Sequence, residues 1–89
     1  IAVIDSGVDA SHPDIAGRVG ECVEAVADGR RIIFVPSESG DSAGHGTACA
    51  GIVATIAPDA VIHSIKVLGA GGLGDGHAFL AGIEYAVKK

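Results

Sequence analysis

The stretch Gly44-His45-Gly46-Thr47-Ala48-Cys49-Ala50-Gly51 decides the fold of this chain. It predicts a helix of small residues that begins at His45 and ends near Ile56, before Pro58. One face of that helix carries residues at the spacing expected for packing on a sheet, namely Cys49, Ile52, Val53 and Ile56. Cys49 follows His45 by one helical turn, so we expect its sulfur to lie beneath the imidazole.

A carboxylate able to orient this imidazole stands near the start of the chain. Asp5 follows the apolar run 1–4, which predicts a strand buried on both faces of a parallel sheet. An acid at the carboxyl end of such a strand lies at the edge where open α/β sheets build their sites. Gly7 permits the chain to turn sharply there. We therefore predict that Asp5 and His45 form a functional pair in which the histidine is a general base.

The remaining sequence alternates between predicted strands and helices. Strands are predicted at 22–27, 31–35 and 60–68, and the first two are joined by a hairpin turn at Asp28-Gly29. A short helical turn is predicted from Ser11, an N-cap candidate, to about Gly17. A second long helix is predicted at 76–87, with Phe79, Leu80, Ile83 and Val87 facing the core. This alternation predicts a mostly parallel α/β sheet with helices on its faces.

Composition excludes several classes of function. The 89 residues are 48% hydrophobic and carry a net charge of −5 without a basic cluster, so neither nucleic acid nor an anionic membrane is expected as a partner. No apolar run is long enough to span a bilayer. Two cysteines do not define a disulfide framework, and we expect Cys49 to be reduced. His12, His63 and His77 lack the spacing of a metal site, so no metal ligand is predicted.

Two motifs carry a resemblance to a known family. Ile-Ala-Val-Ile-Asp-Ser-Gly-Val at 1–8 and His-Gly-Thr-Ala-Cys-Ala-Gly at 45–51 resemble the aspartate and histidine signatures of the subtilisin-like serine peptidases, the subtilases. The resemblance implies a three-layer α/β fold, with residues 1–89 as the N-terminal portion of one catalytic domain. It also implies a serine endopeptidase in which Asp5 and His45 act with a serine, and with an oxyanion asparagine, downstream of this chain. The 89 residues alone are then expected to be inactive.

A glycine-rich segment leaves two interpretations open. Gly69–Gly74 satisfies the G-x-G-x-x-G pattern between a predicted strand and a predicted helix, which is the setting of a dinucleotide-binding loop. The resemblance implies a different role, an edge on which an extended peptide pairs with exposed backbone. On that interpretation, which we favour, the substrate-binding residues are Leu68, Gly72, Leu73 and Gly74. A nucleotide-binding domain is one alternative, and an inactive peptide-binding pseudopeptidase is another.

The resemblance also bears on partners and metals. It implies an extended peptide or protein substrate, an inhibitory propeptide in the parent protein, and no cofactor. Many subtilases bind calcium through an acid that matches Asp14 and a loop inserted after the histidine helix. Here the chain runs straight on through residues 54–58, so most of the oxygen ligands of that site are missing and no calcium is expected. Secretion is the commonest case in the family, but no signal peptide is visible and no compartment is predicted.

Overall fold

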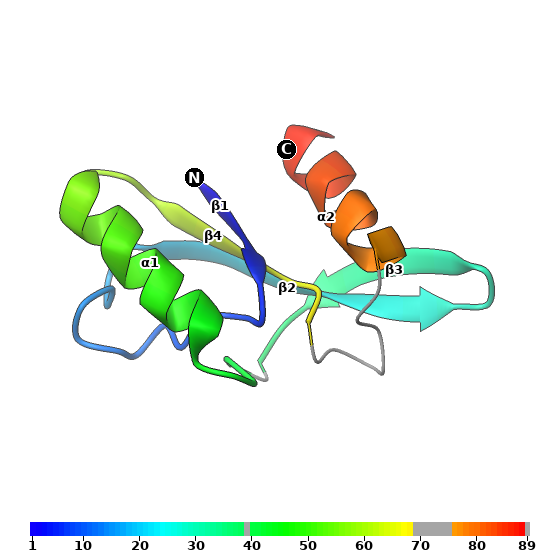
Figure 1. Ribbon diagram of the computed structural model, residues 1–89, viewed down its shortest axis with the longest axis horizontal. Coiled ribbons are helices and arrows are strands. Elements are labelled where there is room, and N and C mark those ends of the chain that lie inside the picture. The colour runs from blue at the N-terminus through cyan, green and yellow to red at the C-terminus, as the bar shows by residue number, and fades with distance from the viewer. Residues whose placement is uncertain (39, 69–75, 89) are drawn as a thin grey trace.

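The computed structural model describes residues 1–38, 40–68 and 76–88. Within these residues, four strands and two helices follow one another (Figure 1). The strands are β1 Ala2–Asp5, β2 Val19–Asp28, β3 Arg31–Pro36 and β4 Ile62–Lys66. The helices are α1 His45–Ile56 and α2 Gly76–Lys88, and neither is long and apolar enough to cross a membrane. Each predicted strand and long helix is confirmed, with boundaries shifted by at most three residues.

The sheet has the strand order β1-β4-β2-β3. β4 pairs in parallel with β1 on one side and with β2 on the other, whereas β3 pairs antiparallel with β2. The turn between β2 and β3 has Gly29 at its first position with φ +62°, as a two-residue hairpin loop of type II′ requires. The expected α/β class with a mostly parallel sheet is therefore confirmed, and the β2–β3 hairpin extends past β1 and β4 (Figure 1).

The two helices cover opposite faces of the sheet. Val3 and Ile62 point to the face covered by α1, where they form a buried cluster with Ala50 and Ala54. The neighbouring strand residues point the other way, because successive side chains in a strand alternate between faces. Ile65 and Val67 thus pack under α2, together with Val23, Ala25 and Ala78. The prediction of helices on both faces is confirmed.

Helix α1 does not present the predicted face to the sheet. Its buried residues are Gly46, Ala50 and Ala54, whereas Ile52 and Ile56 are 61% and 78% exposed. The prediction of a core face containing these two isoleucines was wrong. The helix carries no charged residue and is apolar on most sides, so hydrophobic periodicity does not single out one face.

Helix α2 is oriented by the same preference for small residues. Ala78 and Gly82 are buried, whereas the four predicted core residues Phe79, Leu80, Ile83 and Val87 are each more than a third exposed. That prediction was also wrong. A Cβ added at Gly82 would lie 3.0 Å from a side-chain carbon of Ile4 and 3.1 Å from one of Val67. Because the helix approaches the strands this closely, only its smallest residues fit between them.

The segment predicted as a short helical turn forms successive turns instead. The backbone N–H groups of Ile15 and Ala16 both donate to the carbonyl of His12. The cap is Asp9 and not Ser11, since the Asp9 carboxylate accepts hydrogen bonds from both the N–H and the hydroxyl of Ser11. The turns bury Ile15 completely, which adds it to the cluster under α1.

A pair of isoleucine substitutions tests where the core lies. Ile62 is fully buried, so Ile62→Ala should lower the free energy of unfolding by about 2–5 kcal/mol through lost contacts and the cavity left behind. Ile56→Ala removes the same atoms from a position that is 78% exposed within residues 1–89, and in this 89-residue chain it should change the free energy of unfolding by less than about 0.5 kcal/mol. Urea unfolding measures both values. Equal losses at the two positions would contradict the assigned packing.

Candidate functional site

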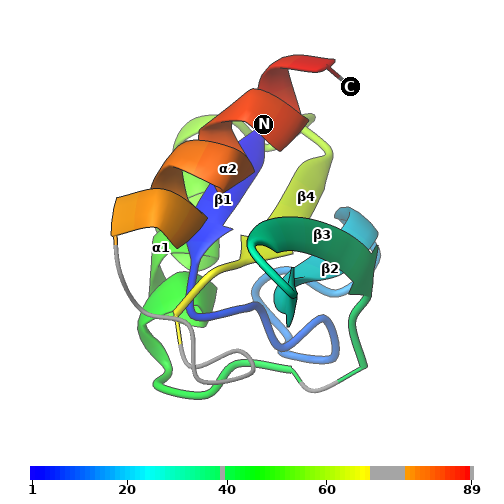
Figure 2. The same cartoon turned by 90° about the vertical axis from the view of Figure 1, so that its right-hand side faces the viewer.

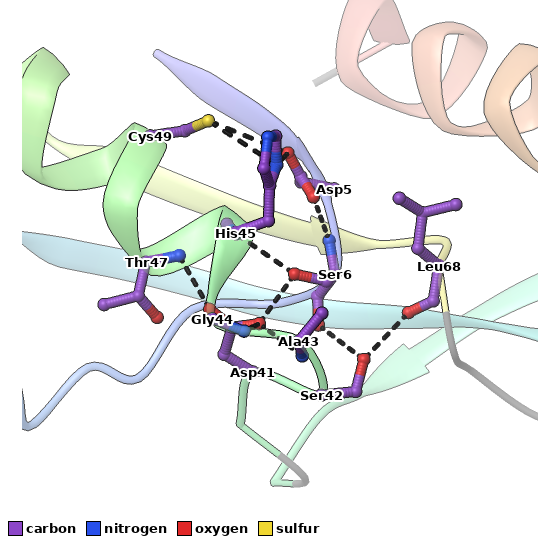
Figure 3. A network of polar contacts seen from close by, with 11 residues as sticks. Asp5, Ser6, Asp41, Ser42, Ala43, Gly44, His45, Thr47, Cys49 and Leu68 are labelled. Carbon is purple, nitrogen blue, oxygen red and sulfur yellow. Dashed lines mark hydrogen bonds and ion pairs between the residues drawn. The ribbon is translucent and has the colours of Figure 1, made fainter.

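The site lies where the carboxyl ends of β1 and β4 meet the first turn of α1, toward the lower edge of Figure 2. His45 is the first residue of α1, and its Nδ1 lies 2.6 Å from Oδ2 of Asp5, the last residue of β1 (Figure 3). The Asp5 side chain is 12% exposed and the His45 side chain 70% exposed. The two residues that the sequence pairs are thus in contact.

Asp5 is held by its own backbone surroundings. Its second carboxylate oxygen, Oδ1, accepts a hydrogen bond of 2.7 Å from the backbone N–H of Ser6. Its carbonyl accepts from the N–H groups of Val67 and Leu68, just beyond β4, at 2.8 and 3.2 Å. One carboxylate oxygen is therefore oriented by the turn after β1, which leaves the other to receive the imidazole.

Asp41 organises the chain before His45, and sequence reasoning did not single it out. Its Oδ1 accepts hydrogen bonds from the N–H groups of Ala43 and Gly44 and from the Ser6 hydroxyl, at 3.0, 2.8 and 2.6 Å. Its Oδ2 accepts from the N–H of Thr47 at 2.8 Å. The N-cap residue Gly44 has no side chain, so Asp41 satisfies the first turn of α1 from three residues farther back (Figure 3).

These hydrogen bonds change the acidity of Asp41. Partial burial by itself raises the pKa of its carboxyl, but the hydrogen bonds from Ser6 and Thr47 favour the ionised form and outweigh burial. The net effect lowers the pKa well below the ordinary value of 3.8. Asp41 is therefore a fixed negative charge at the positive end of α1.

Ser6 joins the strand end to the helix. Its fully buried hydroxyl donates to Asp41 and accepts from the N–H of Gly46 at 3.0 Å. Gly46 itself packs on the backbone of the turn that follows β1, since a Cβ at position 46 would lie 2.0 Å from the carbonyl oxygen of Gly7. The helix start and the strand end thus meet backbone to backbone.

Lys66 is a second residue whose role sequence reasoning missed. It is 3% exposed and lies on β4 between Asp5 of β1 and Glu24 of β2, which are its partners across the sheet. Its ammonium donates to the carbonyl of Gly40 at 3.2 Å, which anchors the loop that leads to His45. A charged residue inside an otherwise apolar strand was the signal that could have pointed to it.

Cys49 lies beside the pair, as predicted. Its Sγ is 3.7 Å from Nδ1 of His45 and 3.8 Å from Oδ2 of Asp5. Cys49 and Cys22 are both free thiols. The sulfur lies on the Nδ1 side of the ring, so Cys49 stands outside the route by which a proton would reach Nε2.

The predicted substrate-binding residues fall only partly within the described chain. Leu68 is half-buried just after β4, and its carbonyl accepts a hydrogen bond of 3.3 Å from the Ser42 hydroxyl. Gly72, Leu73 and Gly74 lie outside the described residues, as does the whole of the Gly69–Gly74 segment that matches a nucleotide-binding loop.

Asp14, the acid considered above for calcium, has an exposed side chain with Oδ2 3.9 Å from His12 Nδ1. Over residues 1–38, 40–68 and 76–88, the histidine, cysteine and acidic side chains form one group of three whose donor atoms could share a metal. That group is Asp5, His45 and Cys49, and Asp14 is not part of it.

Comparison with known proteins identifies the family. The family model described as "Subtilase family" matches residues 1–89, the whole chain. The chain belongs to the subtilase family. The family predicted from the two motifs is thus confirmed, and the Asp5–His45 pair lies on those motifs.

Curated subtilases are similar along the whole chain. Subtilisin E of Bacillus subtilis is 37% identical over 100 residues, covering 99% of this chain and 23% of that protein. Subtilisin of Bacillus pumilus is 36% identical, with coverage of 99% and 32%. Thermitase of Thermoactinomyces vulgaris is 36% identical over 99 residues, covering 100% and 33%. This subtilase chain therefore spans about a quarter to a third of these relatives, and no solved structure matches it.

Two glycines of α1 test the backbone contact at the site. Gly46→Ala places a methyl group against the Gly7 carbonyl and should lower the free energy of unfolding by about 1–3 kcal/mol or more. Gly51→Ala, on the same helix, meets nothing closer than 4.0 Å and should raise it by about 0.5–1 kcal/mol through helix propensity. Thermal melts of the two variants measure the difference. A neutral Gly46→Ala would show that the helix start is not in contact with the turn.

Replacing Asp41 tests the cap and its charge. Asp41→Ala removes the acceptor for the first turn of α1 and should cost about 0.5–2 kcal/mol at neutral pH. Because the folded-state pKa is lowered, this stabilisation is complete above the ordinary pKa of 3.8 and is lost as the pH falls below it. Unfolding measured from pH 7 to strongly acidic pH should show the variant and the wild type converging. A difference independent of pH would assign the effect to packing and not to the ionised carboxylate.

Proposed function

We propose that this chain is the N-terminal portion of the catalytic domain of a serine endopeptidase, with His45 as the general base and Asp5 as the carboxylate that orients it. The observation that carries the proposal is the 2.6 Å contact between His45 Nδ1 and Asp5 Oδ2. Occupation of Nδ1 directs Nε2 of a 70% exposed ring outward, which suits a base that receives a proton from a nucleophile. Membership of the subtilase family supports the same reaction.

In the proposed mechanism a serine hydroxyl attacks the scissile carbonyl while His45 takes its proton at Nε2. Asp5 keeps the imidazole in the tautomer with the hydrogen on Nδ1 and stabilises the imidazolium that forms. His45 then returns the proton to the leaving amine. The histidine thus serves as base and then as acid within one half-reaction.

The nucleophile is proposed to come from beyond residue 89. The hydroxyls of Ser6 and Ser42, the serines of the network in Figure 3, are directed elsewhere: Ser6 donates to Asp41, and Ser42 lies against the carbonyls of Ser6 and Leu68. Neither is aimed at the imidazole. The oxyanion asparagine is proposed to lie downstream as well.

The exposed helix faces support a larger domain. Ile52 and Ile56 on α1, and Leu80, Ile83 and Val87 on α2, are each at least half exposed. Apolar surface of this extent on both layers is typical of surface that other elements cover. We propose that further strands and helices of the same domain cover it, in line with the greater length of the relatives.

The proposed substrate is an extended peptide. Leu68 ends the run that follows β4, and we propose that it and the neighbouring Gly72, Leu73 and Gly74 pair with the backbone of a substrate by strand addition. Peptides and proteins are thus the proposed substrate class, and an inhibitory propeptide in the parent would occupy the same edge. A nucleotide at this loop remains the alternative for the glycine pattern.

Substitutions in the full-length protein test the proposed pair. His45→Ala and Asp5→Asn should each lower kcat for a peptide substrate by roughly 10⁴-fold or more, because the two side chains act as one unit with the serine. KM should change little, since neither side chain is proposed to bind the peptide. His63→Ala, which alters an exposed imidazole at the other end of β4, is the matched control and should leave kcat unchanged.

Two outcomes would reject parts of this function. Normal turnover in His45→Ala would remove the histidine from the mechanism. A wild-type protein that binds peptides without cleaving them would instead be the pseudopeptidase. Residues 1–89 alone serve as a further control and are expected to show no turnover.

A further inference from the structure

Asp5, His45 and Cys49 bring three different metal-ligating groups together. A carboxylate oxygen, an imidazole nitrogen and a thiol sulfur lie within 4.8 Å of one another. His45 and Cys49 are four residues apart on α1, the spacing by which two ligands on one helical turn reach the same ion. Asp5 comes from the adjacent strand end, so the three groups converge from two elements.

We propose that this cluster binds a borderline-soft divalent cation such as Zn²⁺, and that the bound ion switches the Asp5–His45 pair off. Tetrahedral zinc with usual bond lengths separates sulfur from nitrogen or oxygen ligands by about 3.5–3.6 Å. The corresponding distances from Cys49 Sγ are 3.7 Å to His45 Nδ1 and 3.8 Å to Asp5 Oδ2. The sulfur is therefore already at ligand distance from both partners.

The distance between His45 Nδ1 and Asp5 Oδ2 must increase when an ion binds. Nitrogen and oxygen ligands of zinc lie about 3.3 Å apart, whereas Nδ1 and Oδ2 are 2.6 Å apart. The His45 side chain is 70% exposed and can swing outward by this amount, while the Asp5 carboxylate stays anchored by the Ser6 N–H. The ion would thus take the place of the proton between Asp5 and His45. A water completes four-coordination on the exposed side.

Charge and protons balance at such a site. The Cys49 thiol gives one proton to solvent and becomes a thiolate, and the Asp5 carboxylate is the second anion. Together they neutralise a dication, with the imidazole as a neutral ligand. Nδ1 must be free of hydrogen to bind the metal, so the ring keeps its single hydrogen on Nε2.

This tautomer is the opposite of the one that the proposed function needs. A general base must present Nε2 without a hydrogen, with Asp5 holding the hydrogen on Nδ1. With the ion on Nδ1, the hydrogen of the ring is on Nε2. The ring can then no longer accept a proton from a nucleophile. The inhibitory effect rests on the proposed function, whereas the metal site rests on the three donor atoms alone.

Cobalt spectroscopy on the full-length protein tests the metal site without reference to activity. Co²⁺ replaces Zn²⁺ in sites of this kind and gives a near-ultraviolet charge-transfer band when a thiolate binds it. The band should appear in the wild type, disappear in Cys49→Ala and persist in Cys22→Ala. Cys22 is the matched control, since burial, with a further contribution from Glu21, raises the pKa of its thiol. Zn²⁺ should also protect Cys49, but not Cys22, from alkylation, as mass spectrometry of the wild type would show.

Turnover measurements test the switch. Zn²⁺ should inhibit peptide hydrolysis by the wild type, and a chelator should restore it. Cys49→Ala should remain active and require a more than about tenfold higher Zn²⁺ concentration for the same inhibition. Loss of a residue that only hydrogen-bonds a metal ligand already lowers metal affinity by about tenfold or more, and Cys49 is proposed to bind the ion directly. Cys22→Ala should match the wild type.

The outcomes separate the two proposals. A cobalt band that is absent from the wild type, or that persists in Cys49→Ala, would overturn the metal site. Cobalt binding at Cys49 without any effect of Zn²⁺ on turnover would overturn the switch. A protein that never cleaves peptides but shows the Cys49-dependent band would reject the peptidase and retain the metal site.

Discussion

The backbone contact between Gly46 and the Gly7 carbonyl is the constraint on which the site depends. Any side chain at position 46 would place its first carbon 2.0 Å from that oxygen, so the start of α1 can approach the end of β1 only because this residue is glycine. The approach brings the Gly46 N–H to the Ser6 hydroxyl and the His45 ring to Asp5. Hydrogen bonds orient these groups, but they can come together only because position 46 is glycine, which has no side chain.

Much of the fold could be predicted from local pattern. The strand 1–4 is a short apolar run, and the hairpin has an Asp-Gly turn between two apolar segments, so each is specified by neighbouring residues. Which face of each helix is buried could not be predicted in this way. Large apolar residues lie on several sides of α1 and α2, and the sheet selects the small ones because the backbones approach closely. That selection depends on tertiary contact, which periodicity does not contain.

Some residues of the site could likewise be predicted from local sequence, whereas others could not. Asp5 and His45 could be paired from sequence because each occupies a distinctive motif at the end of a predictable element. Asp41 could not, since an aspartate in a polar, glycine-containing loop has the appearance of an ordinary turn residue. Asp41 matters because its carboxylate accepts hydrogen bonds from Ser6, thirty-five positions away, and from a backbone N–H in the first turn of α1. Lys66 was indicated only by its charge, and its contact with Gly40 is again distant in sequence.

Both helices contact the sheet through small residues, and this limits how the sequence of the protein can diverge. Where large side chains interdigitate, a change in one of them shifts a helix axis and displaces whatever the helix carries. Under α1 the spacing is set by backbone atoms and by Gly46, Ala50 and Ala54, which leave little volume to vary. These three positions therefore tolerate little increase in size, because a larger side chain would move the start of α1 away from β1. The outward-facing isoleucines do not set this spacing, and their divergence is limited instead by the elements that we propose to cover them.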